Sequence, residues 1–167
     1  MIRSANNQDT NQIAEVHVRT WQVAYKNQIP NEILENLSIK SRLNIWENII
    51  NDTTQKTFVY VLNNKVIGFC NIGKYRESKN KKLEGEIRAI YLLSEYWSRG
   101  FGGKLLSESL EYFNANGFEV VYLWVLKTND RVINFYKKFG FVADGKIKTD
   151  QREEYILNEI RMVKNIL

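Results

Sequence analysis

Hydrophobic and polar positions along this chain change their period several times, and each change predicts an element. Residues 2–5 (Ile-Arg-Ser-Ala) could form a short first strand. A helix follows, with Asn6 or Asn7 as its N-cap and Asp9 in its first turn, where the helix dipole favours an acid. Its apolar positions form two stripes, so we expect this helix to contact two surfaces. Two further helices are predicted over residues 31–37 and 41–50.

The middle of the chain carries the pattern of β-strands. Residues 56–62 and 65–73 are two strand-like runs that flank the pair Asn63-Asn64. Asparagine tolerates the left-handed conformation that a two-residue turn requires, so these segments predict a β-hairpin. Residues 83–93 predict a third strand beside it.

The second half of the chain alternates helices with strands. Residues 102–116 have apolar side chains at helical spacing, and Gly117 is a natural C-terminal stop. Residues 119–126 are almost all apolar, as expected of a strand that is buried on both faces. Residues 130–139 predict a short amphipathic helix. A closing hairpin is predicted over residues 141–147 and 155–164.

This order of elements predicts one α/β (α+β) domain that spans residues 1–167. The first strands form a meander, and residues 83–126 form a parallel strand–helix–strand unit. The sheet is therefore expected to be mixed, with helices flanking it. Such a unit places ligand sites at the carboxyl ends of its strands.

Composition narrows the class of protein. Hydrophobic residues make up 44% of the 167 residues, which is enough for a folded core. No apolar run reaches the ~18 residues that cross a bilayer, and the first residues lack the pattern of a secretion signal. The one cysteine, Cys70, cannot form an intrachain disulfide. We therefore expect a cytoplasmic protein with no membrane partner and no metal site.

The net charge of +5 raises the question of a nucleic-acid partner. The basic residues are spread along the chain apart from one cluster, which we interpret as a solvated hairpin tip. Nucleic-acid binding is therefore not expected and stays a hypothesis that rests on charge alone. A modest positive excess also suits a protein that binds a polyanionic small molecule. The cluster consists of Lys74, Arg76, Lys79, Lys81 and Lys82.

A glycine-rich turn, Arg99-Gly100-Phe101-Gly102-Gly103, lies between the third strand and its helix. Glycine lets a backbone or a ligand approach closely, and the first N–H groups of a helix have no internal partner. Together they predict an anion site that could hold a pyrophosphate. The turn lacks the Gly-Lys-Ser/Thr ending of a Walker A loop and the spacing of a dinucleotide-binding fold. Taken alone it fits a ligand-free loop equally well.

Three regions of the chain resemble the GNAT superfamily of N-acetyltransferases. Residues 87–92 and 95–106 are similar to its motif A, residues 129–141 (Asn-Asp-Arg-Val-Ile-Asn-Phe-Tyr-Lys-Lys-Phe-Gly-Phe) to its motif B, and residues 159–164 to its last strand. The resemblance implies a mostly antiparallel sheet of six to seven strands. It also implies acetyl-CoA as co-substrate and acetyl transfer to an amine by direct attack. Trp97 departs from the pattern, because the family usually has Gln or Arg there.

The resemblance also assigns a binding surface for coenzyme A. It implies that the amide of Leu92 stabilises an oxyanion, that Asn129 contacts the pantetheine arm or caps the next helix, and that Lys138 reaches the 3′-phosphate. The full set of expected cofactor contacts is Ile90, Tyr91, Leu92, Ser98, Arg99, Gly100, Phe101, Gly102, Gly103, Lys104, Asn129, Asn134, Tyr136 and Lys138.

Acetyl transfer needs an acid and a base, because a thiolate departs and an alkyl ammonium, with a pKa of roughly 10, must lose a proton. By resemblance Tyr136 protonates the thiolate; the alternative is a core aromatic of an amphipathic helix. Glu86 is our expected general base, acting directly or through water, with Glu84 in reserve. A structural or acceptor-binding role for the Glu86 carboxylate is equally compatible with the sequence.

The acceptor is less well defined. The N-terminal half resembles a bacterial branch that includes spermidine/spermine acetyltransferases, which suggests a polyamine or other small amine. An antibiotic amine, a protein N-terminus or a non-catalytic CoA-binding module are the alternatives. Exposed sheet edges would allow a homodimer. We expect a surface or core role for His17 rather than a catalytic one, and we expect Cys70 to be a small buried apolar residue. The expected acceptor pocket, in which aromatic rings could contact a cation, comprises Trp21, Tyr25, Tyr75, Glu84, Glu86 and Trp124.

Overall fold

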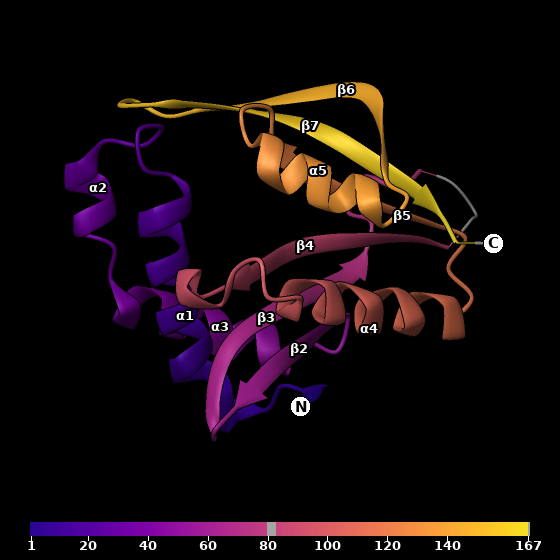
Figure 1. The fold of residues 1–167 in the computed structure, drawn as a ribbon, viewed down its shortest axis with the longest axis horizontal. Helices are drawn as coiled ribbons and strands as arrows, with labels where there is room; N and C mark the ends of the chain where they lie inside the picture. The colour runs from indigo at the N-terminus through magenta and orange to yellow at the C-terminus, as the bar shows by residue number, and fades with distance from the viewer. Residues whose placement is uncertain (80–82, 167) are drawn as a thin grey trace.

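The computed structural model describes residues 1–79 and 83–166. Its centre is a seven-stranded sheet with the order β1-β2-β3-β4-β5-β7-β6 (Figure 1). Among the paired strands of the described residues, β4 and β5 are parallel and all other neighbours are antiparallel, which confirms the predicted mixed sheet. The strands are β1 (Ile2–Ser4), β2 (Gln55–Leu62), β3 (Lys65–Lys74), β4 (Glu84–Leu92), β5 (Val120–Leu126), β6 (Val142–Gln151) and β7 (Ile156–Asn165).

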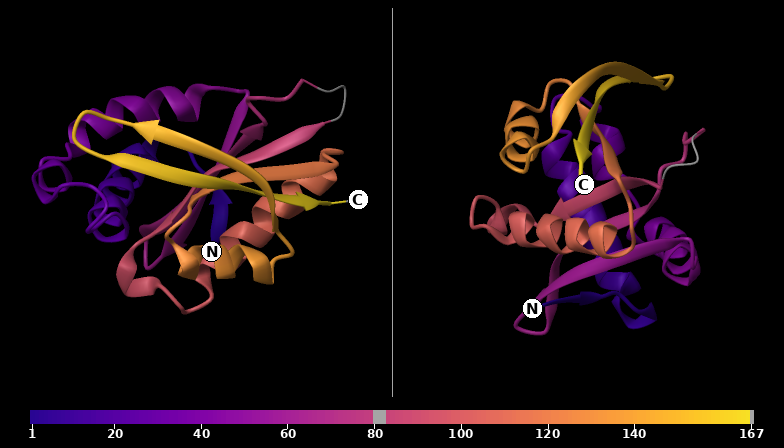
Figure 2. Two further views of the ribbon diagram at one scale, coloured as in Figure 1. Left: turned by 90° about the horizontal axis from the view of Figure 1, so that it is seen from above. Right: turned by 90° about the vertical axis from the view of Figure 1, so that its right-hand side faces the viewer.

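Helices cover both faces of this sheet (Figure 2). Leu105 and Phe113 of α4 and Ile133 of α5 share one apolar cluster on the first face. Ile13 of α1 and Trp46 of α3 belong to a second cluster on the opposite face. The helices are α1 (Thr10–Ala24), α2 (Asn31–Glu35), α3 (Ile39–Asn51), α4 (Phe101–Ala115) and α5 (Asp130–Lys138), with 3-10 turns at Asn7–Asp9 and Ser94–Tyr96.

The start of the first helix follows the sequence signal closely. The Asn6 side chain accepts a hydrogen bond from the Gln8 amide at 2.9 Å, and Asp9 accepts one from the Asn6 amide at 2.9 Å. This reciprocal capping box satisfies two amides that would otherwise lack a partner. Arg3 pairs with the buried Asp9 at 2.7 Å, and this hydrogen bond lowers the pKa of the carboxyl group. The capping turn is a 3-10 turn, so α1 itself begins at Thr10.

The first hairpin also forms where the sequence predicts it. Asn63 and Asn64 connect β2 to β3 with φ angles of 48° and 61°. Two positive φ angles in a two-residue connection define the turn whose twist matches that of the flanking strands. The pair Asn63-Asn64 therefore sets the register of β2 against β3.

The two central strands separate along their length. β4 carries a bulge, because its register against β3 shifts by one residue and leaves Arg88 as the extra residue. β4 and β5 pair only as far as Ile87 with Leu123. Both strands continue beyond that point, to Leu92 and Leu126, without pairing to each other. We call this separation of the two strand ends the splay.

Two sequence expectations need correction at the boundaries. β6 extends to Gln151 rather than ending at residue 147, because its polar second half pairs with β7 while remaining largely exposed and so lacks an apolar signal. In the basic cluster, Arg76 is not simply solvated but pairs with Glu86 at 2.6 Å. Lys81 and Lys82 of that cluster lie outside the described residues. Within the described chain, no helix is long and apolar enough to cross a membrane.

Candidate active site

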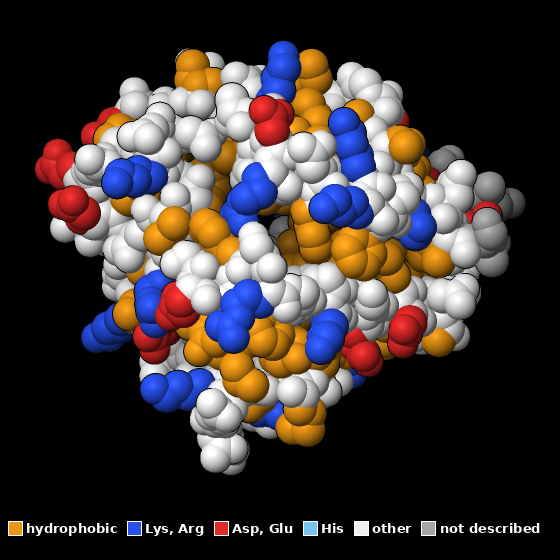
Figure 3. Space-filling model, viewed as in Figure 1, with side chains coloured by type: hydrophobic (Ala, Val, Ile, Leu, Met, Phe, Trp, Pro, Cys, Tyr) orange, Lys and Arg blue, Asp and Glu red, His pale blue; other side chains and the backbone are white. Residues whose placement is uncertain are grey.

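A cavity of about 1280 Å³ is lined by the start of α4, by α5, and by the separated ends of β4 and β5. Figure 3 shows a hollow on this face with Lys and Arg side chains around it. Four cationic residues, Arg88, Lys104, Arg131 and Lys138, belong to the lining among the described residues. A positively charged rim raises the local concentration of an anionic ligand and favours its binding.

The glycine-rich turn forms the first wall of the cavity. Gly100 precedes α4 with a φ of +83°, and no side chain caps the helix. The first intrahelical hydrogen bond runs from the Lys104 amide to the Gly100 carbonyl at 3.2 Å. The amides of Phe101, Gly102 and Gly103 consequently have no intrahelical acceptor. Uncapped amides at a positive helix end suit an anionic group, so this wall fits the pyrophosphate of coenzyme A.

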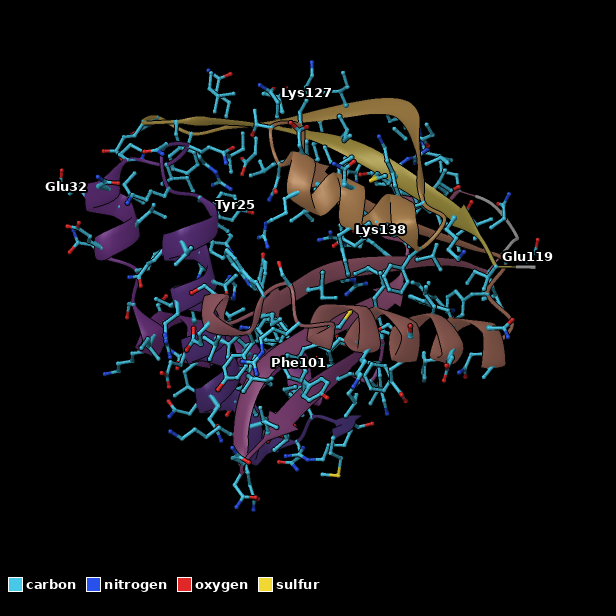
Figure 4. The ribbon with its side chains drawn as sticks, viewed as in Figure 1. Tyr25, Glu32, Phe101, Glu119, Lys127 and Lys138 are labelled. Carbon is cyan, nitrogen blue, oxygen red and sulfur yellow. The ribbon has the colours of Figure 1, made fainter. Side chains whose placement is uncertain are left out.

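The first turn of α4 packs closely against α5. A Cβ atom at Gly103 would lie 3.1 Å from the ring of Phe139, so only glycine lets α5 approach the first turn of α4 this closely. Figure 4 labels Phe101 at the start of α4 and Lys138 on α5, the two helices that flank the opening. The anion site therefore lies between a backbone surface and the charged side of α5.

The end of β4 forms the floor. The Leu93 amide donates to the Ile67 carbonyl of β3 at 2.9 Å. Because hydrogen-bonding groups alternate along an antiparallel ladder, the N–H and C=O of Leu92 are directed away from β3, toward the splay. The Leu92 carbonyl accepts hydrogen bonds from Trp97 Nε1 at 2.6 Å and from Thr20 Oγ1 at 3.3 Å. The Leu92 amide lies on that same side of the strand.

Tyr136 lies at the boundary between the core and the cavity. Its side chain is 5% exposed, belongs to the main apolar cluster, and packs against Phe141 with ring centroids 5.7 Å apart. It also lines the cavity. Burial raises the pKa of its phenol, and the neighbouring Cys70 adds to the effect. The hydroxyl is therefore protonated near neutral pH and able to donate.

Asn129 fulfils its structural alternative and also lies in the cavity wall. Its side chain caps α5 by accepting from the Val132 amide at 3.2 Å. Asn134 and Lys138, further along the same helix, line the cavity as well. One helix thus contributes polar groups along its whole length.

Two of the expected cofactor side chains lie elsewhere. Arg99 stacks over the rings of Tyr96 and Phe101, at 5.7 Å and 5.5 Å from their centroids. Phe101 packs on Tyr60 at 5.0 Å. Neither belongs to the cavity lining among the described residues, so only their backbone amides remain as expected contacts. The other expected cofactor residues all line the cavity: Ile90, Tyr91, Leu92, Ser98, Gly100, Gly102, Gly103, Lys104, Asn129, Asn134, Tyr136 and Lys138.

The far end of the cavity, near the end of α1, is aromatic. Tyr25 and Trp124 line it as expected, whereas Trp21 stands behind Tyr25 with ring centroids 4.6 Å apart. Burial, together with Tyr91 and Glu159, raises the pKa of the Tyr25 phenol, which keeps it neutral. A neutral aromatic end suits the apolar or cationic part of a ligand.

Glu159 is the residue of this end that the sequence did not reveal. It lies on β7, opposite Leu126 of β5, and lines the cavity. Lys148 of β6 lies 3.4 Å from its carboxylate and 5.5 Å from the centroid of the Trp124 ring. An ammonium group therefore already occupies the space between an acid and an aromatic ring. The only signal in the sequence was an acid within the last strand.

Glu86 is placed outside the cavity, which corrects its expected role. Its side chain is 2% exposed and bound by Arg76 at 2.6 Å and 3.0 Å. The Arg76 amide adds a third hydrogen bond at 3.2 Å. A general base must reach the proton it removes, and these oxygens are already engaged in an ion pair beside the cavity. Glu86 is not retained as the base.

Tyr75 and Glu84 also belong to a buried polar network rather than to the cavity lining of the described chain. The Tyr75 hydroxyl accepts from Arg161 at 2.8 Å, and its ring lies 4.5 Å from that of Tyr122. The Tyr122 hydroxyl donates to Glu84 at 3.4 Å. These contacts stabilise the sheet next to the site, so the two residues are removed from the expected acceptor pocket.

His17 and Cys70 are core residues. His17 Nδ1 accepts from Trp46 Nε1 at 3.0 Å, and burial lowers its pKa to about 3. Burial raises the pKa of the Cys70 thiol to about 12, which leaves it unreactive near neutral pH. In the part of the chain that the structure describes, no group of three or more His, Cys, Asp or Glu side chains could hold a metal ion.

Comparison with known proteins agrees with this geometry. A relative from Bacillus subtilis, the "Uncharacterized N-acetyltransferase YuaI", is 32% identical over 142 residues, which cover 83% of this chain and 78% of the relative. A mycothiol acetyltransferase from Acidimicrobium ferrooxidans is 34% identical over 80 residues, covering 48% of this chain and 26% of that protein.

Solved structures share the fold. The PaiA N-acetyltransferase from Thermoplasma acidophilum, solved with coenzyme A, superposes with a TM-score of 0.79 at 21% identity and covers 99% and 98% of the two chains. An N-acetyltransferase from Staphylococcus aureus Mu50 gives a TM-score of 0.79 at 21% identity, with coverage of 100% and 98%. Residues 12–141 match the acetyltransferase (GNAT) family, and the chain belongs to that family.

Proposed function

We propose that this GNAT N-acetyltransferase transfers the acetyl group of acetyl-CoA to a primary amine on a small cationic molecule, with a polyamine as the favoured acceptor. The observation that carries the proposal is a single cavity with two ends. We call the wall formed by residues 98–104 and α5 the donor end. We call the group of Tyr25, Trp124 and Glu159 the acceptor end.

At the donor end, the uncapped amides of Phe101, Gly102 and Gly103 are proposed to bind the pyrophosphate. Asn129 is proposed to contact the pantetheine arm beside the separated strands, where an extended chain can add to the free edge of β4. Lys138 is proposed to bind the 3′-phosphate. When bound, acetyl-CoA supplies a thioester whose acetyl carbon an amine can attack.

Two residues between the ends are proposed to carry the chemistry. The Leu92 amide would donate to the acetyl oxygen as negative charge develops there. The Tyr136 hydroxyl, which burial keeps protonated by raising its pKa, would donate its proton to the departing thiolate. The substrate ammonium first loses one proton to solvent, and the free amine then attacks to form the new C–N bond. As the C–S bond breaks, the thiolate takes the Tyr136 proton, and the proton that the acylated nitrogen loses restores the Tyr136 phenol.

The acceptor end supports a cationic substrate. Glu159 offers a carboxylate, and Tyr25 and Trp124 offer ring faces, a combination that binds alkylammonium groups. Lys148 supports this reading, since its own ammonium lies against Glu159 and Trp124. An antibiotic amine and a protein N-terminus remain lower in our order, because each brings bulk that a cavity shared with coenzyme A must accommodate.

The test is a thiol-release assay of acetyl-CoA against polyamines, amino acids, aminoglycosides and peptides. We expect di- and polyamines to react fastest, with kcat/KM rising with pH as the free amine fraction grows. Release with peptides alone would contradict the small-amine acceptor. Absence of release with every amine would contradict acetyl transfer to amines.

We further propose an oligomeric state and a cellular location for this protein. β6 is an edge strand with Val142 and Ile147 each 60% exposed, which supports a homodimer through that edge. Light scattering of the purified protein would test this, with a monomer at all concentrations as the contrary result. A cytoplasmic location is proposed on the single buried cysteine and is tested by cell fractionation.

A further inference from the structure

Trp97 makes two contacts that link three segments of the site. Its Nε1 donates to the Leu92 carbonyl at 2.6 Å, which fixes the indole against the end of β4. The other contact is with Arg131, whose guanidinium carbon lies 4.0 Å from the centroid of the indole ring. Trp97 and Arg131 both line the cavity, which Gly102 and Gly103 at the start of α4 line as well. The indole thus connects β4, the glycine-rich turn and α5.

The stacked geometry leaves Arg131 ready for a ligand. Stacking uses the flat face of the guanidinium, so its N–H groups remain directed outward around its edge. Within the described residues, no ion pair involves Arg131, and the residue is exposed. Holding the side chain on a ring also removes part of the conformational entropy that binding would otherwise cost.

We propose that Trp97 and Arg131 form a composite phosphate contact, in which the indole presents the guanidinium of Arg131 to the pyrophosphate of coenzyme A. The proposal rests on the proposed function, because it assumes that the α4 amides hold that pyrophosphate. The Arg131 fork donates two parallel hydrogen bonds to phosphate oxygens, which a backbone amide cannot do alone. Trp97 is a positioning residue that acts through Arg131.

Lys138 provides the matched comparison on the same helix. It lies seven residues after Arg131, roughly 10 Å along the axis of α5 at ~1.5 Å per residue. One cation cannot serve both ends of such a span. Arg131, which stacks on Trp97 just before the glycine-rich turn, is assigned to the pyrophosphate, and Lys138 to the 3′-phosphate. Ligands that lack one or the other group can separate these roles.

The experiment measures binding by isothermal titration calorimetry with coenzyme A, dephospho-CoA and pantetheine, for the wild-type protein, Arg131→Met and Lys138→Met. Arg131→Met should weaken the binding of coenzyme A and of dephospho-CoA by the same factor, roughly 10- to 30-fold for a charge-assisted bidentate contact. It should leave the affinity for pantetheine unchanged and reduce the salt dependence of coenzyme A binding. Lys138→Met should weaken the binding of coenzyme A but not that of dephospho-CoA.

A second pair of variants tests the role of the indole. Trp97→Phe keeps a ring but loses the hydrogen bond to Leu92, and should weaken coenzyme A by roughly 3- to 10-fold. Trp97→Arg combined with Arg131→Met returns a guanidinium to the same place and should recover most of the affinity lost in Arg131→Met. Circular dichroism and thermal unfolding check that each variant is folded.

The outcomes separate two failures. Equal binding of coenzyme A by Arg131→Met and wild type would overturn the composite contact, as would an equal loss of pantetheine affinity, which indicates a structural role. If the double variant does not recover the affinity for coenzyme A, Trp97 is not part of the composite contact. A wild-type protein that does not bind coenzyme A would instead overturn the proposed function on which the contact depends.

Discussion

The donor end and the acceptor end of the cavity are built in opposite ways. At the donor end, backbone amides provide the contacts, and Gly100 and Gly103 fix their geometry within one short stretch of sequence. At the acceptor end, side chains provide the contacts, and they come from α1, β5 and β7. A site made of backbone is specified by local conformation. A site made of side chains depends on how distant segments pack.

This difference governs how each end can vary. The amides of α4 are available with almost any side chain at those positions, provided that the glycines remain. Replacing Tyr25, Trp124 or Glu159 changes the surface that meets the acceptor without altering the donor end. A family can therefore keep one donor and change acceptors, and the predictions below test how separate the two ends are.

Tyr136 lies between the ends, and its removal should have the largest effect. Tyr136→Phe keeps the ring in the core but deletes the proton donor, so kcat should fall about 100- to 1000-fold, within the usual range for general-acid catalysis. The affinity for acetyl-CoA, measured by calorimetry, should be unchanged. Tyr112→Phe on α4, outside the cavity lining of the described residues, is the matched control. If kcat of Tyr136→Phe equals that of the wild-type protein, Tyr136 has only a structural role as a core aromatic residue.

Gly100→Val tests whether the donor end depends on backbone geometry. At a φ of +83° a branched side chain is strained by about 1–3 kcal/mol, and relief of that strain would displace the following amides. We expect coenzyme A affinity to fall about 100-fold. Gly145→Val introduces the same strain at a φ of +86°, far along the chain in β6, and nothing lies near its Cβ position. Gly145→Val should lower the free energy of unfolding but retain the affinity for coenzyme A. An equal loss of coenzyme A affinity in both variants would show that the effect of Gly100→Val is not local to the donor end.

His17 packs against Trp21, which in turn packs against Tyr25 of the acceptor end. The lowered pKa of His17 predicts that the stability of the protein depends on pH. The folded pKa of about 3 lies below the ordinary value of 6.5, so the unfolded chain binds more protons between these values. Stability is therefore full above pH 6.5 and is lost as the pH falls toward 3. Between pH 7 and pH 5 the loss should be about 2 kcal/mol. Urea unfolding at the two pH values would measure it.

The control for this effect is His17→Gln. Its side-chain oxygen can accept from Trp46 Nε1 in place of His17 Nδ1 but does not titrate. The variant should lose less stability than wild type over the same pH interval. An equal loss would assign the acid sensitivity to other groups, such as Asp9, whose lowered pKa also makes it a source of acid-induced loss.

The contrast between the ends also explains what the sequence could predict. The Asn63-Asn64 turn, the capping box at Asn6 and the glycines before α4 are local signals, and each forms the structure expected of it. Family resemblance extended this to Asn129 and Tyr136, because a motif records spacing as well as residue type. Both of these residues line the cavity.

The acceptor end could be predicted only in part, since Tyr25 and Trp124 line it as expected but Glu159 was missed. Glu86 and Glu159 are both carboxylates on strands, and no local feature distinguishes them. Arg76 engages Glu86 across the β3–β4 connection, while the pairing of β5 with β7 brings Glu159 to the cavity. Trp21 and Tyr25 are likewise one helical turn apart, yet only Tyr25 lines the cavity. Long-range packing decides each case.

Glu159→Gln gives the smallest expected effect and the sharpest separation of the ends. The change keeps the shape of the side chain but removes its charge, so a cationic acceptor loses one favourable contact while acetyl-CoA loses none. We expect kcat/KM for a polyamine to fall about 10-fold, as for a partly exposed charge contact, with unchanged acetyl-CoA affinity. Steady-state kinetics with spermidine, and with a monoamine that has an uncharged tail, would measure this. The monoamine should be less affected.

Two comparisons make this prediction decisive. Glu153→Gln removes an equal charge from an exposed position near the β6–β7 turn, and it should leave kcat/KM unchanged for both amines. Lys148→Met removes the ammonium that lies against Glu159 and Trp124. Because the Glu159 carboxylate then has no ion-pair partner from Lys148, kcat/KM for the polyamine should rise by a small factor. Improvement in Lys148→Met together with loss in Glu159→Gln would place the substrate cation where the lysine ammonium now lies. Equal loss for both amines in Glu159→Gln would instead mean that the carboxylate orders the pocket rather than recognising charge.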